Sequence, residues 1–164
     1  MNLKNPFLAA FGVGIVLIAI AVAGVFYMQR GARVGLTGKF LKVRLAPLDE
    51  TSTAVVVDFR FTNPSDVNFV VRNVTVIMED NAGNQYDGQT VSEVDAKRLF
   101  DAVPLLGEKY NPTLVIMDKI APKVTEDRMV AARFAAPESK IEPRKRFLVR
   151  IEEVDGSIVE FSEK

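Results

Sequence analysis

Hydrophobic and polar residues follow two different patterns along the chain. The stretch from Pro6 to Met28 holds 23 residues without a charge. A helix rises about 1.5 Å per residue, so this stretch reaches about 34 Å and can cross a hydrocarbon core of about 30 Å. Three residues near its end fit an interfacial anchor of one aromatic and two basic side chains: Tyr27, Arg30 and Arg33. The pattern predicts a tail at residues 1–5 and a single transmembrane helix at 6–29.

Two other interpretations of this stretch are open. Ala21-Val22-Ala23 has the small-x-small form of a signal-peptide cleavage site, so the stretch could be a leader that is removed. It could also be a buried core helix, although a small soluble domain has no interior that surrounds so long an apolar helix. We favour the membrane anchor because apolar residues continue through Met28.

One face of the predicted helix carries mostly small residues at a heptad-like spacing: Ala10, Gly14, Leu17, Ala21 and Gly24. Small side chains let a second helix approach closely in lipid. This face therefore predicts packing against a partner helix. The alternative is that alanine and glycine are simply common in bacterial membrane helices.

Beyond a glycine-containing linker at residues 30–38, apolar and polar residues alternate as in β-strands. The clearest case is Thr53–Thr62, where one face carries Val55, Val57, Phe59 and Phe61 and the other carries Asp58 and Arg60. In 69–78, we expect the even-numbered residues from Val70 to Met78 to share a face. Strands are predicted at residues 40–45, 53–62, 69–78, 85–90, 113–117, 128–135, 145–152 and 157–162.

Turn and capping residues separate these segments. Asn63-Pro64, Asp80–Asn84 and Asp155-Gly156 are turn signals, and Ser92 can cap a short helix that ends before Pro104. Short strands at this spacing predict a mainly β domain over residues 39–164, an immunoglobulin- or fibronectin-like β-sandwich with one short helix. The second half of its core is expected from Phe134, Phe147, Leu148, Val149, Ile151, Val154, Ile158, Val159 and Phe161.

The segment Val55–Asp80 resembles the start of the water-stress or late-embryogenesis-abundant type β-sandwich. In that family an alternating strand runs into an Asn-Pro turn, as Val55–Thr62 runs into Asn63-Pro64 here, and a second strand follows. The resemblance implies a fibronectin-like fold and a binding or protective role, with no catalytic residues to carry over. The overall layout also resembles membrane-anchored immunoglobulin-like proteins of bacteria.

Charge is distributed unevenly. Residues 1–44 carry six basic residues and no acidic one, whereas residues 45–164 carry 15 basic and 21 acidic residues. A net-negative domain argues against nucleic-acid binding, which needs a concentrated basic surface. The chain has no cysteine and no histidine. These absences remove thiol nucleophiles, thiolate metal sites and the usual proton shuttle, so we expect no enzyme activity, cofactor or metal.

Few residue groups suggest specific chemistry. Adjacent carboxylates such as Glu152-Glu153 point to opposite faces of a strand and are expected to be solvated. The segment Asp80–Asp87 faintly resembles a calcium loop but fits a hairpin better. One basic cluster is a candidate contact for an acidic partner or anionic lipid, or else a guard against edge aggregation: Arg144, Lys145, Arg146 and Arg150.

These features predict a non-catalytic accessory or scaffold subunit of a larger bacterial membrane complex, for example a respiratory or photosynthetic one. Its partners would be the lipid bilayer and other membrane subunits. The alternative is a free-standing envelope protein that binds a ligand or protects against stress. The basic residues after the helix favour a cytoplasmic domain. We nevertheless favour the inner membrane with a periplasmic domain, because Lys39, Lys42 and Arg44 can belong to the first strand.

Overall fold

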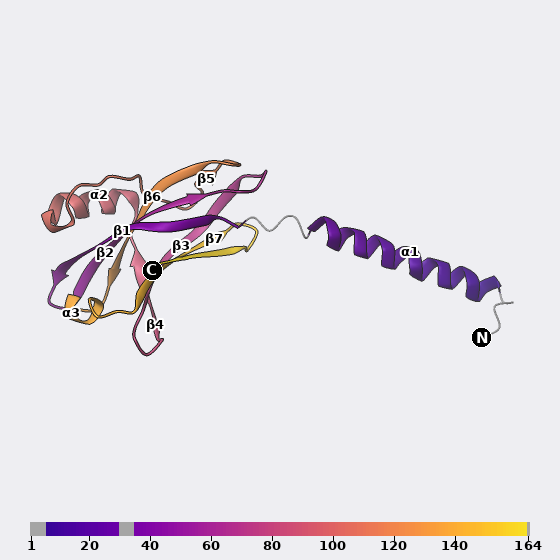
Figure 1. Cartoon of the computed structure of the whole chain (residues 1–164), viewed down its shortest axis with the longest axis horizontal. Coiled ribbons are helices and arrows are strands. Elements are labelled where there is room, and N and C mark those ends of the chain that lie inside the picture. The colour runs from indigo at the N-terminus through magenta and orange to yellow at the C-terminus, as the bar shows by residue number, and fades with distance from the viewer. Residues whose placement is uncertain (1–5, 30–34, 164) are drawn as a thin grey trace. The chain divides into compact units, whose positions relative to one another are not determined.

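A computed structural model describes residues 6–29 and 35–163 of the protein. The chain divides into two compact units at Arg33 and Val34. The first unit contains α1 (Pro6–Gln29), one uninterrupted helix whose side chains are described over residues 10–25 (Figure 1). No helix is long and apolar enough to cross a membrane in the part of the chain that the structure describes, which for the side chains of α1 is residues 10–25. The predicted tail, 1–5, lies outside the described residues.

The second unit is mainly β, as the alternation predicts. Its helices are α2 (Glu93–Ala102), the 3-10 turn η1 (Pro104–Leu106) and the one-turn α3 (Glu138–Ile141), so it has more helix than the one segment expected. Its strands are β1 (Thr37–Asp49), β2 (Ser52–Thr62), β3 (Phe69–Glu79), β4 (Gln85–Thr90), β5 (Lys119–Ile120), β6 (Thr125–Phe134), β7 (Arg146–Glu153) and β8 (Ile158–Ser162).

The strands form one sheet that curls into two layers. Their order is β1-β2-β6-β4-β3-β7-β8, with every neighbouring pair antiparallel and β5 added beside β3. Strand β4 pairs with β3 through its first residues and with β6 through Gln89 and Thr90, so it joins the layers. Layers β1-β2-β6 and β3-β7-β8 face each other as a β-sandwich.

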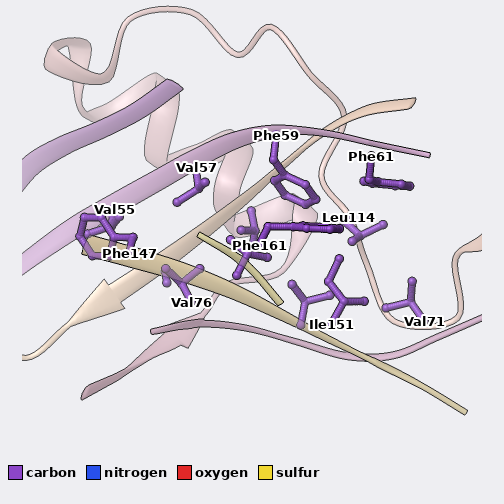
Figure 2. Packing of buried hydrophobic residues seen from close by; sticks show 14 of the residues in the cluster. Val55, Val57, Phe59, Phe61, Val71, Val76, Leu114, Phe147, Ile151 and Phe161 are labelled. Carbon is purple, nitrogen blue, oxygen red and sulfur yellow. The ribbon is translucent and has the colours of Figure 1, made fainter. Parts of the chain in front are cut away.

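The main core lies between these layers. The face of β2 that carries Val55, Val57, Phe59 and Phe61 is fully buried, as its alternation predicts. Figure 2 shows these side chains opposite residues of the other layer, including Phe161 of β8. The rings of Phe59 and Phe161 are 6.0 Å apart between centroids. Aromatic pairs at such distances stabilise a core beyond the area that they bury.

A second, smaller core lies on the outer face of β1-β2-β6. Helix α2 covers it and begins where predicted: Ser92 Oγ accepts a hydrogen bond from the Asp95 N–H at 3.1 Å. The residues that pack there come from β1, β2, β6, α2 and η1: Ala46, Ala54, Val56, Met129, Ala131, Ala96, Phe100 and Leu106. Strand β2 is therefore buried on both faces from Ser52 to Phe59. Asp58, predicted on a polar face, is buried with it, whereas Arg60 on that face is exposed.

The prediction of a strand at residues 113–117 is wrong. Thr113 makes one isolated bridge to Met129, Leu114 turns into the core, and the chain then reverses. The Asp118 carboxylate accepts from the Val115 N–H at 3.0 Å and fixes this turn. An apolar run can therefore contribute to a core from a loop that pairs with a strand at a single position.

The face predicted for residues 69–78 holds only for their second half. Val74, Val76 and Met78 are buried together, but before them Phe69 and Val71 are buried while Arg72 is exposed. A register shift between Val71 and Asn73 against β7 explains the change. One extra residue in a strand reverses its inward and outward positions.

Two of the predicted core residues are exposed. Val154 is 51 % exposed and Ile158 is 59 % exposed, because both flank the turn between β7 and β8 at the end of the sandwich. Val159 is partly buried against the main core. The other predicted core residues of the second half are buried, so the error is confined to this turn.

Candidate interaction surfaces

The predicted helix-packing face lies within one helix. Four of its residues are exposed and Gly14 is partly exposed: Ala10, Gly14, Leu17, Ala21 and Gly24. A Cβ added at Gly14 or Gly24 would meet no atom within 4 Å. The small-residue face of α1 is therefore open along its described length.

The predicted membrane-interface residues lie at the end of α1 and after it. Tyr27 belongs to α1, but its side chain lies outside the described part of the chain. Arg30 and Arg33 lie outside the described residues. Their role stays a prediction from the sequence.

The predicted basic cluster is largely neutralised within the protein. Arg144 pairs with Glu163 at 2.9 Å, and Arg150 pairs with Glu160 at 2.7 Å. Lys145 and Arg146 both reach Glu79, at 2.6 Å and 2.7 Å. These four basic residues therefore offer less free charge to a partner than their sequence suggests.

Glu79 is the centre of this basic cluster and is itself nearly buried. Hydrogen bonds from Lys145 and Arg146 lower the pKa of the Glu79 carboxyl. The two cations are 66 and 67 residues away in sequence, across the β3–β7 pairing. The cluster thus ties two strands of one layer together.

Sequence reasoning missed a buried ion pair. Arg44 of β1 donates to Asp58 of β2 at 2.6 Å, and both side chains are more than 90 % buried. The other guanidinium nitrogen of Arg44 donates to the carbonyl oxygens of Leu106 and Glu108, both at 2.7 Å. Asn111 completes the group by donating to the second Asp58 oxygen at 2.8 Å. We call these residues the Arg44 clamp, because they fasten the segment after α2 to the sheet.

Aromatic rings enclose the clamp. The Arg44 guanidinium lies 4.9 Å from the Phe100 ring centroid and 5.7 Å from that of Tyr110. Such cation–π contacts favour the charged arginine in a site with little water. The Arg44 Nε nevertheless has no hydrogen-bond partner. The clamp therefore has one unsatisfied donor and leaves Tyr110 and Leu105 exposed above it.

The candidate calcium loop is a hairpin turn. The Asp80 carboxylate accepts from the Ala82 and Asn84 N–H groups, both at 2.9 Å, and from the Asn84 side chain. These hydrogen bonds, with that of Tyr86, lower the pKa of Asp80. Among the described residues, no group of three or more acidic side chains is placed to hold a metal ion.

A cleft of about 840 Å³ lies beside this hairpin, between it and α3. A second, of about 520 Å³, lies between the edge strands β1 and β8. Two more flank α2, of about 890 Å³ and 430 Å³. All four are open clefts. Three are lined by charged groups of both signs, and the cleft of about 430 Å³ has Glu93 as its one charged lining residue.

Glu153 at the end of β7 is a buried carboxyl without a cation beside it. Its Oε1 accepts only a long hydrogen bond of 3.4 Å from the Val70 N–H, and its Oε2 has no partner. Burial, and then the nearby Asp155, raise the pKa of Glu153 above its ordinary value of 4.5. Ionised Glu153 therefore opposes folding.

We expect Glu153→Gln to raise the free energy of unfolding by about 1 kcal/mol at pH 7, because it removes an unpaired buried charge. A raised folded-state pKa means that the contribution of Glu153 is favourable below pH 4.5 and is lost as pH rises through the folded value. The gain should therefore vanish at pH 4. Urea unfolding at both pH values checks this, with the partly exposed Glu152→Gln as control. An equal gain in both variants would contradict the assignment.

Comparison with known proteins gives only distant structural likenesses. No family model matches the chain, and no curated protein matches it at a significant level. An uncharacterised β-sandwich protein from Clostridium difficile 630 is 13 % identical, over 79 % of this chain and 85 % of that chain, with a TM-score of 0.41. The archaellum periplasmic stator protein FlaG from Sulfolobus acidocaldarius is 11 % identical, over 78 % and 99 %, with a TM-score of 0.37.

A complex of FlaF and FlaG from the same organism is 11 % identical, over 77 % of this chain and 87 % of that chain, with a TM-score of 0.38. TM-scores this low carry no argument about function. The resemblance to the water-stress type domain stays a prediction from the sequence.

Proposed function

We propose that the protein is a non-catalytic, single-pass accessory subunit of a bacterial membrane complex and acts through protein contact. The observation that carries the proposal is the open small-residue face of α1, on a helix of 24 residues that contains no charge. Such a face suits close packing against another helix in lipid. In this proposal α1 is the membrane anchor, and the sandwich lies on the periplasmic side of the inner membrane.

The second unit fits this role as an immunoglobulin-like module. Its strand orders β1-β2-β6 and β3-β7-β8 correspond to the A-B-E and C-F-G orders of that architecture. Immunoglobulin-like sandwiches commonly present loops and faces to other proteins. The chain has neither histidine nor cysteine, and its buried carboxyls are tied into structure or lie apart from the clefts, which supports a role without catalysis.

Leucine at Gly14 and Ala21 is expected to release the protein from its partner subunits. The larger side chains would hold a second helix away from the small-residue face. The test is purification of a tagged full-length chain from membranes in mild detergent, followed by quantification of co-purifying subunits. Stoichiometric subunits with the native chain and a loss of at least tenfold with Gly14→Leu/Ala21→Leu support the proposal.

The matched control replaces the same residue types on the opposite helix face, Gly12→Leu with Ala19→Leu. Co-purification should survive there, because these positions lie about half a turn from the small-residue face. Equal loss in both double variants would point to a general defect of membrane insertion. Equal retention would remove the helix-packing proposal, and a native chain that purifies alone would favour the free-standing envelope protein.

A further inference from the structure

Exposed apolar side chains gather at one end of the sandwich. Five large ones, each more than half exposed, lie in the loops there or, for Ile158, at the first position of β8: Val67, Ile116, Met117, Val154 and Ile158. The antiparallel order places the starts of β1, β3 and β8 and the ends of β2 and β7 at this same end. Figure 1 shows the start of β1, β5 and the turn between β7 and β8 together there. We call this surface the apolar end.

Main-chain hydrogen bonds brace these loops against one another. Val154 N–H donates to the Val70 carbonyl at 3.1 Å, and Met117 N–H donates to that of Val71 at 2.7 Å. The Asn63 side chain joins the loop that carries Val67 to the end of β5, by donating to the carbonyl oxygens of Val67 and Ile120. The exposed apolar side chains therefore stand on a fixed surface.

Met117 shows that this presentation has an energetic cost. Its φ is 71°, in the left-handed region that favours glycine, while its side chain is 63 % exposed. A residue with a large side chain is strained in this region, because its Cβ comes close to the backbone. Folding alone gains nothing from holding a large apolar side chain in water. Contact with an apolar medium outside the protein would remove the Met117 side chain from water.

Cations accompany the apolar residues. Arg72, Lys119 and Lys39 are exposed near this end, and within the described residues none of them forms an ion pair. Of the nearby acids, Asp66 pairs with Lys123 at 3.1 Å. Asp155 accepts from the backbone N–H of Ser157 at 2.8 Å and forms no ion pair with any described residue. Apolar side chains beside free cations match the boundary between lipid headgroups and acyl chains.

The chain itself brings this end near the membrane if α1 is an anchor. Only seven residues separate Gln29, the last of α1, from Thr37, the first of β1. A fully extended chain spans at most about 3.5 Å per residue, so Thr37 stays within about 28 Å of the end of α1. Thr37 lies at the apolar end, so the chain enters the sandwich at this end.

We propose that the apolar end of the sandwich docks on the bilayer surface, with Met117 and Val154 among the side chains at headgroup level. The proposal rests on the proposed function, because it requires α1 to be a membrane anchor. Its consequence is orientation: the opposite end and the surface above the Arg44 clamp stay turned to water, where a partner domain can reach them.

Single cysteines in this naturally cysteine-free chain provide the test. The full-length chain would carry a spin label at Met117→Cys or Val154→Cys. Leu48→Cys and Tyr86→Cys serve as controls, since both positions are exposed at the opposite end. Each variant is reconstituted at one chain per nanodisc in phosphatidylcholine with phosphatidylglycerol. Collision rates with oxygen, which concentrates in lipid, and with a water-soluble nickel chelate then report the surroundings of each label.

We expect the ratio of oxygen to nickel collisions at Met117→Cys and Val154→Cys to exceed the ratio at both controls severalfold. Equal ratios at all four positions would overturn the proposal. A high ratio that appears only with several chains per nanodisc would also overturn it, by showing a second copy as the occupant.

A label at Leu17→Cys separates this outcome from failure of the proposed function. Lipid exposure at Leu17→Cys with water exposure at Met117→Cys and Val154→Cys would refute the docking alone. Water exposure at Leu17→Cys as well would refute the anchor, and the docking with it. Circular dichroism that matches the native chain confirms that each variant is folded.

Discussion

Replacing Asn63 by aspartate is expected to lower the free energy of unfolding by about 3 to 5 kcal/mol at pH 7. Asn63 is fully buried after β2, and its side-chain nitrogen donates to three carbonyl oxygens, those of Val67, Ile120 and Ala121, at 2.8 to 3.2 Å. Its Oδ1 accepts from the N–H and the hydroxyl of Ser65. Aspartate has the same shape but would turn a carboxylate oxygen toward three acceptors.

Urea unfolding of the full-length chain in detergent measures this loss. The matched control is Asn68→Asp, the same change at an exposed position of the same loop, which should cost less than about 0.5 kcal/mol. Part of the loss at Asn63→Asp should be recovered near pH 4, where the introduced carboxyl takes up a proton and can donate again. A loss no larger than that of Asn68→Asp would show that the Asn63 hydrogen bonds contribute little.

The Asn63-Pro64 turn does more than end β2. In the sequence it is a common turn signal, and the turn does form there. The structure adds that Asn63 fastens the turn to a segment almost sixty residues away, since its partner Ile120 is 57 residues along the chain. Local pattern predicts where a strand stops. It does not reveal which distant backbone the stopping residue will bind.

The alternation of β2 predicted its main buried face correctly, because burial between two layers requires a period of two. The fate of Asp58 on the other face could not be predicted in this way. That face is covered by α2, whose position depends on where the chain returns after β4. A charged residue in an alternating strand looks solvated until its cover and its partner Arg44 are known.

The ion pairs of the candidate contact residues could not be predicted from the sequence either. Arg144, Lys145, Arg146 and Arg150 look like a basic cluster in sequence because residues 143–151 contain no acidic residue. Their carboxylate partners belong to β3, β8 and the segment after β8, which only the sheet topology brings alongside. The sequence did not predict the apolar end, because Val154 and Ile158 are apolar and were therefore expected in the core.

The other large effect concerns the Arg44 clamp. Arg44→Met is expected to lower the free energy of unfolding by about 3 to 5 kcal/mol, because it leaves Asp58 buried without its cation. The carbonyl oxygens of Leu106 and Glu108 lose their donor in the same step. Arg60→Met is the matched control: Arg60 of β2 pairs with Asp127 of the neighbouring strand β6 at 2.6 Å, but its side chain is 49 % exposed. An exposed pair contributes at most about 1 kcal/mol.

A double-variant cycle separates the ion pair from the packing around it. Asp58→Asn alone leaves the Arg44 charge buried without its anion, whereas Arg44→Met/Asp58→Asn removes both charges. The double variant should therefore be more stable than the sum of the two single losses predicts. Hydrogen exchange at residues 104–111 supplies the second readout. Exchange should accelerate in every variant without Arg44, because the Leu106 and Glu108 carbonyls then have no hydrogen bond from Arg44. The double variant should regain part of the free energy of unfolding, while exchange at residues 104–111 stays fast. Additive losses, or unchanged exchange, would mean that Phe100 and Leu106 hold this segment to the sheet by apolar packing, with no contribution from the buried charges.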